Sequence, residues 1–304
     1  MKEAMKRLLL FLLVFPLLGR VGAQDPQTFQ VSINVDLVVL NATVRDQKGR
    51  VAADLREQDF DVFEDGVKQA IRLFRHEDIP VTVGLVIDHS GSMRSKLASV
   101  VAAARTFIQS SSADDQMFVV NFNENVTLGL PAAIPFTNRQ EDLTYAISNT
   151  PVTGKTALYD AIWKARERMA SGSRDKKVLI VISDGGDNAS AHTLADLLQA
   201  GNKSNIQVFT IGIFDPNDPD KNPAVLRQLA MATGGEAFVP EELSDVVPVC
   251  ESIAKDIRSQ YTLGYLSSAA TQAGGYHSIK VVARGTGKAK LHVRTRSGYS
   301  GGGR

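Results

Sequence analysis

Hydrophobic residues in the middle of the chain gather into short runs, and polar residues separate one run from the next. Three runs have the length of a strand and are rich in β-branched and aromatic residues: 81–87, 116–122 and 177–183. An almost entirely apolar run of this length is typical of a strand with both faces buried, as in the interior of a parallel sheet. The pattern therefore predicts a parallel sheet in this region.

The stretches between these runs have the periodicity of amphipathic helices. Residues 96–110 repeat apolar side chains at helical spacing, from Leu97 to Ile108. Strands that alternate with helices favour an α/β fold: a doubly wound, mostly parallel sheet with helices on both faces. Further helices are predicted at 139–147, 157–170, 193–203, 223–232 and 241–259, and further strands at 126–130, 206–213 and 236–239.

Both flanks of this α/β region have a different pattern, in which short β runs are separated by turn residues. Neither flank is long enough to bury a large core alone. We therefore expect the two flanks to pack together as one small β-sandwich, with the α/β domain inserted between them. The predicted parts are a β segment at 24–79, the α/β domain at 80–258, and a second β segment with a flexible tail at 259–304.

The first residues have the layout of a secretory signal peptide. Lys2, Lys6 and Arg7 precede the apolar run 8–18, and small residues precede a cleavage point after Ala23. The alternative is an uncleaved membrane anchor, but the run is shorter than the roughly 20 residues that span a bilayer. We expect residues 1–23 to be removed and the mature chain, which has no membrane span, to be exported to a bacterial periplasm or secreted.

Composition excludes several classes of function. Of the 304 residues, 43% are hydrophobic and 22% are charged, and the net charge is +1, so nothing indicates nucleic-acid binding. The single cysteine, Cys250, excludes an intrachain disulfide and a cysteine-rich zinc site. Because Cys250 lies in a mostly apolar helical pattern, we expect it to be a small buried hydrophobe.

Candidate chemistry follows the first buried run. Asp88, Ser90 and Ser92 come at alternating positions after it, with Gly91 between the serines. Open α/β sheets bind ligands beyond the carboxyl ends of their strands, so the position indicates a binding site. Carboxylate and hydroxyl oxygens suit a hard divalent cation, Mg²⁺ first, with Ca²⁺ or Mn²⁺ as alternatives.

The segment VTVGLVIDHSGSM, residues 81–93, resembles the metal-ion-dependent adhesion site (MIDAS) of von Willebrand factor A domains through its D-x-S-x-S spacing. The resemblance implies a Rossmann-like fold and two further ligands from distant loops. Thr156 in TGKTALYDAI and Asp184 in VLIVISDGG match them in order. In the flanks, QDFDVFEDGVKQAI, QYTLGY and SGY resemble bacterial proteins that carry such a domain.

The resemblance also implies a function. Ser90, Ser92 and Thr156 would contact the ion, while Asp88 and Asp184 would act mostly through water. The open coordination position would take an Asp or Glu side chain from a partner protein, which is binding or adhesion and not catalysis. In the family a shift of the last helix, here 241–259, can couple to the metal loops.

Each of these residues also has a plainer interpretation. Ser90, Ser92 and Thr156 could cap helices, and Asp184-Gly185 could be a simple turn. Asp187 and Asn188 are expected to be solvated loop residues, and His89 is expected to point toward solvent. Lys155, beside Thr156, departs from the small residue common there. It could attract a carboxylate or weaken metal binding.

Three other functions remain as alternatives. Gly154-Lys155-Thr156 ends like a nucleotide-binding P-loop and LIVISD resembles the acidic strand of a nucleotide hydrolase, but position 149 is Asn149 where the loop needs glycine. A serine hydrolase would need a G-x-S-x-G segment, which is missing around Ser90 and Ser92. A metal site could also be purely structural and bind no partner.

Overall fold

The computed structural model describes residues 37–76, 78–214, 221–267, 275–285 and 290–301. The predicted signal peptide at 1–23 and the start of the first β segment lie outside these residues. Within the described part of the chain, no helix is long and apolar enough to cross a membrane.

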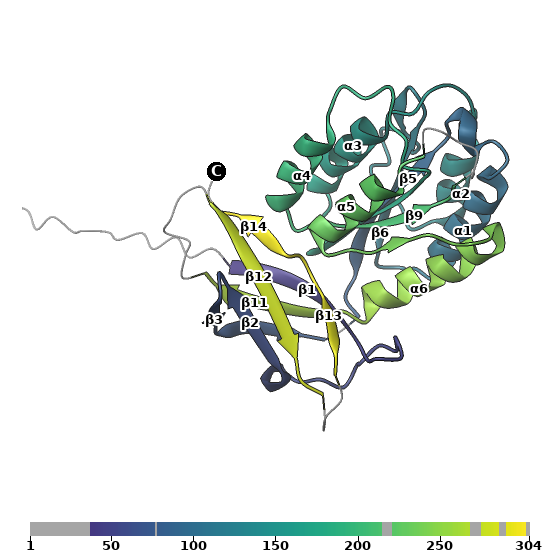
Figure 1. Ribbon diagram of the computed structural model, residues 1–304. Coiled ribbons are helices and arrows are strands. Elements are labelled where there is room, and N and C mark those ends of the chain that lie inside the picture. The colour runs from purple at the N-terminus through teal and green to yellow at the C-terminus, as the bar shows by residue number, and fades with distance from the viewer. Residues whose placement is uncertain (1–36, 77, 215–220, 268–274, 286–289, 302–304) are drawn as a thin grey trace, which may run out of the picture. The chain divides into compact units, whose positions relative to one another are not determined.

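A six-stranded sheet forms the centre of the α/β region, with the strand order β10-β9-β8-β5-β6-β7 (Figure 1). Its neighbours pair in parallel except β7, which is antiparallel to β6 at one edge. The central strand β5 is buried along its whole length, and its neighbour β8 is buried at every residue except Lys177, as their apolar composition predicts. The strands are β5 (Val81–Asp88), β6 (Gln116–Phe122), β7 (Val126–Leu128), β8 (Lys176–Ser183), β9 (Gln207–Gly212) and β10 (Ala237–Phe238).

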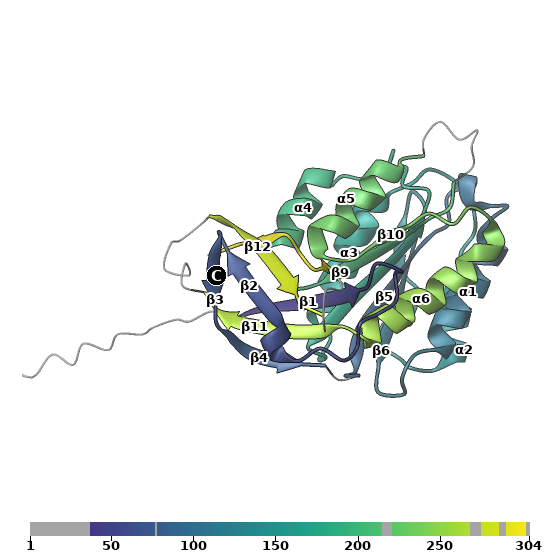
Figure 2. The ribbon, with the colours of Figure 1, turned by 60° about the horizontal axis from the view of Figure 1, so that its bottom comes forward.

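Helices cover both faces of this sheet (Figure 1 and Figure 2). On one side α1 packs against α2 and α6, and on the other α4 lies between α3 and α5. The predicted fold class, a doubly wound α/β sheet, is confirmed. The helices are α1 (Leu97–Gln109), α2 (Gln140–Ser148), α3 (Leu158–Ala170), α4 (Leu194–Asn202), α5 (Pro223–Thr233) and α6 (Val246–Arg258), with 3₁₀ turns at Glu57–Asp59, Gly91–Met93 and Leu243–Asp245.

The two flanks of the chain combine into two antiparallel sheets, β13-β1-β11-β4 and β14-β12-β2-β3. Strands from opposite ends of the sequence pair directly, β1 with β11 and β2 with β12, so neither flank is complete alone. Side chains from both sheets share one hydrophobic core around Leu40, Val62, Tyr261 and Val281. The strands are β1 (Leu37–Arg45), β2 (Phe60–Glu64), β3 (Val67–Gln69), β4 (Ile71–Arg75), β11 (Tyr261–Leu266), β12 (Tyr276–Ala283), β13 (His292–Arg294) and β14 (Gly298–Ser300).

Helix α6 begins five residues later than the sequence pattern predicts, at Val246 instead of residue 241. Pro248 lies in its first turn, where a backbone N–H has no intrahelical partner in any case, so the proline does not interrupt the helix. Cys250 in the same helix is fully buried, and burial raises the pKa of its thiol to about 12.

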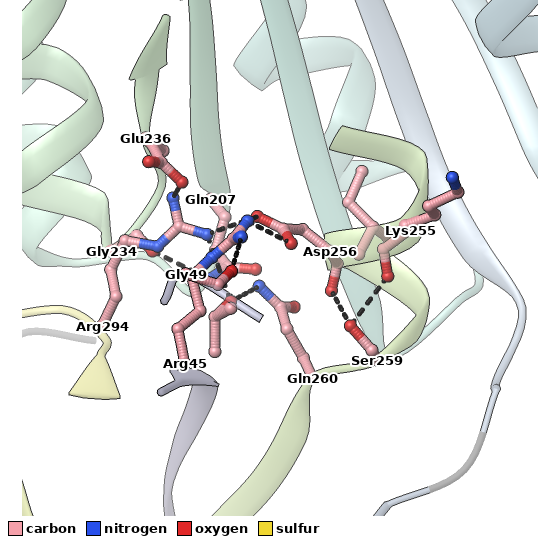
Figure 3. Close-up of polar contacts among 12 residues, drawn as sticks. Arg45, Gly49, Gln207, Gly234, Glu236, Lys255, Asp256, Ser259, Gln260 and Arg294 are labelled. Atoms are coloured by element: carbon pink, nitrogen blue, oxygen red, sulfur yellow. Dashed lines mark hydrogen bonds and ion pairs between the residues drawn. The ribbon is translucent and has the colours of Figure 1, made fainter. Parts of the chain in front are cut away.

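A buried ion-pair cluster joins α6 to the antiparallel sheets (Figure 3). Asp256 of α6 is 1% exposed. Both of its carboxylate oxygens accept hydrogen bonds from the Arg45 guanidinium of β1, at 2.6 and 2.7 Å. Arg294 of β13 donates to the same carboxylate at 3.0 Å and also pairs with Glu236. The one buried negative charge of α6 is therefore matched by two arginines from the flanking β segments.

Candidate metal centre

The predicted site lies where β5 and β8 end. These strands are adjacent and parallel, with Ile87 opposite Ile182, so the loops that follow them leave the same edge of the sheet. One loop carries the D-x-S-x-S segment and the other begins with Asp184. The sheet register thus brings together two segments that are almost a hundred residues apart in the sequence, as the open α/β architecture predicts.

Asp88 is the last residue of β5 and is completely buried. One carboxylate oxygen accepts the backbone N–H of Ser90 at 2.8 Å, and the other accepts the hydroxyl of Ser183 at 2.6 Å. The Ser183 hydroxyl also accepts the backbone N–H of Gly185 at 3.0 Å. Asp88 is therefore fixed in orientation by both loops of the site.

A chain of short hydrogen bonds runs from the serines to the second carboxylate. The hydroxyls of Ser90 and Ser92 are 3.1 Å apart, and the Ser92 hydroxyl donates to Asp184 at 2.5 Å. The other carboxylate oxygen of Asp184 accepts the backbone N–H of Gly186 at 3.2 Å. The structure thus gathers Asp88, Ser90, Ser92 and Asp184 into one polar cluster.

Thr156 is brought to this edge through its backbone. Its N–H donates to the side-chain oxygen of Asn188 at 2.9 Å, and its carbonyl accepts the Asn188 N–H at 3.0 Å, which ties it to the Asp184 loop. The nearby Gly154 carbonyl accepts the N–H of Gly91 at 3.1 Å, which ties the same segment to the serine loop. The Thr156 side chain is almost fully buried. Among the residues that the structure describes, its hydroxyl makes no hydrogen bond to the other four predicted ligands.

Lys96 is a basic side chain at the site that the sequence did not single out. It is 5% exposed, although it sits just before α1. Its ammonium group donates to the carbonyl of Ile213 at 3.0 Å and lies 3.9 Å from a carboxylate oxygen of Asp184. Lys96 therefore offsets part of the negative charge on the Asp184 side of the cluster.

Comparison with family models identifies the architecture that carries this site. The model of the von Willebrand factor type A domain matches residues 82–248, which is more than half of the chain. The chain belongs to the von Willebrand factor type A family. All five predicted ligand positions fall inside the matched residues.

Relatives extend this assignment. Inter-alpha-trypsin inhibitor heavy chain H2 of Mus musculus is 27% identical over 200 residues, which are 62% of this chain. They are 20% of the mouse protein, so this chain spans a fifth of that relative's length. A von Willebrand factor type A protein from Catenulispora acidiphila has a TM-score of 0.52 at 16% identity, over 89% of this chain and 75% of that one.

A second solved structure of the same fold carries a metal. Proximal thread matrix protein 1 from the mussel byssus, solved with a zinc-occupied MIDAS motif, has a TM-score of 0.50 at 18% identity. The likeness covers 60% of this chain and 48% of that protein. Von Willebrand factor type A domains are in general interaction modules, and the MIDAS motif of this mussel protein holds a divalent cation.

The von Willebrand factor type A fold buries His89, which the sequence analysis expected to point toward solvent. That expectation is wrong: His89 is 0% exposed. Its backbone N–H donates to the carbonyl of Phe122 at 2.6 Å, and its ring lies 3.2 Å from the side-chain oxygen of Asn121. Burial lowers the pKa of His89, although the contact with Asn121 acts in the opposite direction. The ring packs into the interior, so His89 is not part of the polar cluster formed by Asp88 and the serines.

The helix-capping interpretation is also wrong for these residues. Ser90 precedes a 3₁₀ turn, but its side chain caps no backbone N–H there. Helix α3 begins at Leu158 with Ala157 as its N-cap, so Thr156 stands outside it. Helix capping therefore does not explain why Ser90 and Thr156 carry hydroxyl groups at these positions.

Asp187 and Asn188 do more than solvate a loop. A carboxylate oxygen of Asp187 accepts the backbone N–H of Tyr159 at 3.0 Å and the Ser190 hydroxyl at 2.6 Å. Together with the two bonds between Asn188 and Thr156, these contacts hold the Asp184 loop against the start of α3. The sequence analysis missed this positioning role because no spacing rule links these loops.

Glu124 is a further acidic residue at the rim. Its carboxylate accepts the backbone N–H of Lys155 at 2.7 Å. Gly154 has φ +81, and a Cβ at this position would lie 1.8 Å from the Glu124 carboxylate. The positive φ favours glycine here, and a Cβ would also displace the Glu124 carboxylate from its present position. The segment 154–156 follows α2, not a strand, so it lacks the strand that a nucleotide-binding P-loop requires.

The electrostatics of the cluster suit a cation. Burial raises the pKa of Asp88 to about 6, and the negative charge of Asp184 acts in the same direction, although hydrogen bonds from Ser183 and Ser90 oppose it. No group of three His, Cys, Asp or Glu side chains surrounds a common point in the described part of the chain. The two carboxylates and two serine hydroxyls of the cluster are oxygen donors of the kind that a hard divalent cation prefers, and they offer no thiolate.

Proposed function

We propose that this protein binds a partner protein through a divalent cation, with Mg²⁺ as the first choice and Ca²⁺ or Mn²⁺ as alternatives. Ser90, Ser92 and Thr156 would contact the ion, and Asp88 and Asp184 would orient its water ligands. The observation that carries the proposal is the pair of buried carboxylates, Asp88 and Asp184, each of which accepts a serine hydroxyl. Among the described residues no arginine contacts them, and Lys96 stays 3.9 Å from Asp184.

The donor set explains why a partner would be needed. Neutral hydroxyl ligands leave a bound cation electron-poor, so it would attract an anionic oxygen at its open position. A carboxylate of Asp or Glu on the partner supplies that oxygen. The protein's own residues hold, orient and partly desolvate the contact, and no bond is made or broken. The proposed role is therefore adhesion or protein binding by an exported, non-enzymatic protein.

Metal uptake tests the first half of the proposal. Chelator-treated protein is titrated with Mg²⁺ and Mn²⁺ by calorimetry, together with the variants Ser92→Ala and Thr156→Ala. We expect saturable uptake by the wild type and a strong loss in both variants. Ser95→Ala is the matched control, because Ser95 lies exposed in the same loop and makes none of these bonds. Absence of uptake by correctly folded wild-type protein would reject the site.

Carboxylate binding tests the second half and separates it from a purely structural metal. The Mn²⁺-loaded protein is monitored by water proton relaxation while the peptides Gly-Asp-Gly or Gly-Asn-Gly, each acetylated at the N-terminus and amidated at the C-terminus, are added. Displacement of water by the aspartyl peptide alone is the expected result. Metal uptake with no difference between the two peptides would favour the structural alternative.

A further inference from the structure

Two adjoining hollows lie at the amino-terminal ends of the central parallel strands, whereas the candidate metal centre lies at their carboxyl-terminal ends. The first has a volume of about 500 Å³ and the second about 580 Å³. They share the lining residues Leu37, Val39, Lys177 and Asn205, so they adjoin, and the two hollows together are called the groove. Strand β8 links these two ends, because it begins at Lys176 in the groove and ends beside Asp184.

Both the antiparallel sheets and the α/β region contribute to this groove. In the first hollow, side chains of β1, β4 and β11 face the segment 172–177 that leads into β8. In the second, the start of β1 and the strand β14 face the carboxyl ends of α3 and α4. The groove therefore exists only in the combined fold.

The lining is strongly cationic. Among the described residues, the first hollow is lined by Arg75, Arg174, Lys177 and the buried Lys176, with Asp175 as the one acid. The described lining of the second includes Arg166, Lys203 and Arg296 and no acid. The whole chain has a net charge of only +1, so positive charge is concentrated here. Like charges held in a cleft repel one another and attract anions into it.

Several of these cations have no countercharge. Arg174, Lys177 and Lys203 form no ion pair among the residues that the structure describes. The Nε atom of Arg174 is buried without a hydrogen-bond partner. Arg75 lies 4.0 Å from Asp175, and both side chains are largely exposed, which makes that pair weak. The groove is thus able to accept negative charge from outside.

Apolar side chains lie between the cations. Leu37, Val39, Leu73 and Ile79 line the first hollow beside Arg174 and Lys177. Leu37 is 46% exposed, which is high for a residue of its type in a strand. A lining that offers both cations and apolar side chains suits a peptide that carries carboxylates and apolar side chains, which an extended chain presents on opposite sides. A phosphate or a sulfated sugar would use the cations and leave the apolar surface unmatched.

We propose that this groove binds an acidic peptide segment of a partner protein in an extended conformation. Its carboxylates would pair with Arg174, Lys177 and Lys203, and its apolar side chains would cover Leu37 and Leu73. This site is separate from the metal centre and needs no cation. It goes beyond the proposed function, because it gives the protein a second binding surface at the other end of the same sheet.

A labelled peptide of alternating Glu and Leu, added to the full chain and followed by fluorescence anisotropy, tests this proposal. We expect saturable binding that weakens as NaCl rises from about 50 to about 300 mM and that is unchanged by EDTA or by Asp88→Ala. The same peptide with Gln in place of Glu should bind at least about ten-fold more weakly.

Variants locate the binding. Arg174→Gln with Lys177→Gln should weaken peptide binding by about ten-fold or more, and Lys203→Gln, in an exposed loop, by about three-fold. The control pair Lys48→Gln with Lys280→Gln removes the same charge from exposed positions elsewhere and should leave the affinity unchanged. Thermal unfolding verifies that each variant is folded, and Lys203→Gln remains informative if the double variant is not.

Three results would overturn the proposal. Equal binding of the Gln peptide would remove the role of the carboxylates. Tighter binding of a heparin oligosaccharide or of single-stranded DNA, lost in the same variants, would assign the groove to another class of polyanion. Loss of peptide binding in EDTA, with no effect of the groove variants, would place the peptide at the metal centre.

Discussion

The buried aspartates Asp256 and Asp88 lie at the centres of two clusters that differ in how their charge is balanced. Asp256 is 1% exposed and meets two arginines, one of which contacts both of its carboxylate oxygens. Asp88 is 0% exposed and meets a serine hydroxyl, a backbone N–H and the charge of a second aspartate. Similar burial therefore accompanies opposite electrostatic environments.

The difference separates a structural ion pair from the proposed binding site. A buried carboxylate with well-placed arginines is satisfied within the protein, and removing one partner leaves the other uncompensated. A buried carboxylate with only neutral donors has no internal cation to offset its charge, so a cation from outside would stabilise its charged form. Lys96 modifies this contrast only slightly, because its ammonium group bonds to a carbonyl and stays 3.9 Å from Asp184.

The largest predicted effect concerns the paired cluster. Asp256→Asn should lower the free energy of unfolding by about 3 kcal/mol, because Arg45 and Arg294 would lose their shared carboxylate. Urea unfolding measures the change, and Asp114→Asn, at an exposed position, is the control. The loss should be the same with and without Mg²⁺. A loss below about 0.5 kcal/mol would mean that this pair is no more than a surface contact.

The next prediction concerns Lys176, a buried lysine that makes no hydrogen bond to a carboxylate among the described residues. Burial lowers the pKa of Lys176 to about 8, although the charges of Asp78 and Asp115 act in the opposite direction. Its ammonium group donates to the carbonyl of Ile257. Between pH 8 and pH 10 the unfolded chain binds a proton at this lysine that the folded chain largely lacks, so stability should rise with pH.

Lys176→Met removes that titration and serves as the reference. From pH 8 to pH 10 the wild type should gain about 2 kcal/mol of unfolding free energy relative to the variant, measured by urea unfolding at each pH. The difference between the two proteins cancels the titration of other groups. If the unfolding free energies of wild type and variant change with pH in parallel, the lysine stays charged when buried.

The smallest predicted effect is a gain in unfolding free energy, in contrast to the loss expected for Asp256→Asn. In metal-free protein, Asp88→Asn should raise the free energy of unfolding by about 1 kcal/mol, because it removes a buried charge that Asp184 repels. Thermal unfolding in EDTA measures this gain. Adding Mg²⁺ should then stabilise the wild type and not the variant. Destabilisation of the metal-free variant would mean that the Asp88 carboxylate is already satisfied within the fold.

Much of the architecture could be predicted from periodicity. The buried strands β5, β6 and β8 are recognisable because each is a short apolar run, and the helices between them repeat at 3.6 residues. Strand β14 was not predicted, since Gly298–Ser300 is too short to show alternation and is defined only by pairing with β12. The late start of α6 depends on the 3₁₀ turn at Leu243–Asp245, which has no periodic signature.

The candidate ligands could be named from sequence because strand ends and motif spacing are local signals. The residues that hold them could not. Ser183 is the last residue of an apolar run, Asn188 reaches across to Thr156, and Lys96 folds back from the start of a helix to Ile213. Each of these contacts joins loops that are distant in sequence, so only the folded chain shows them. The five-residue ligand set itself stays a prediction.

Strand β8 runs without interruption for eight residues, from Lys176 to Ser183. At about 3.3 Å per residue it measures roughly 25 Å, and its hydrogen bonds to β5 and β9 on both sides keep it from bending or sliding. The proposed groove lies at one end of β8 and the proposed metal site at the other. Two partners bound at these sites would be held at a constant separation, too far apart to obstruct each other. A single inextensible segment of backbone would thus make this protein a spacer of set length within an assembly.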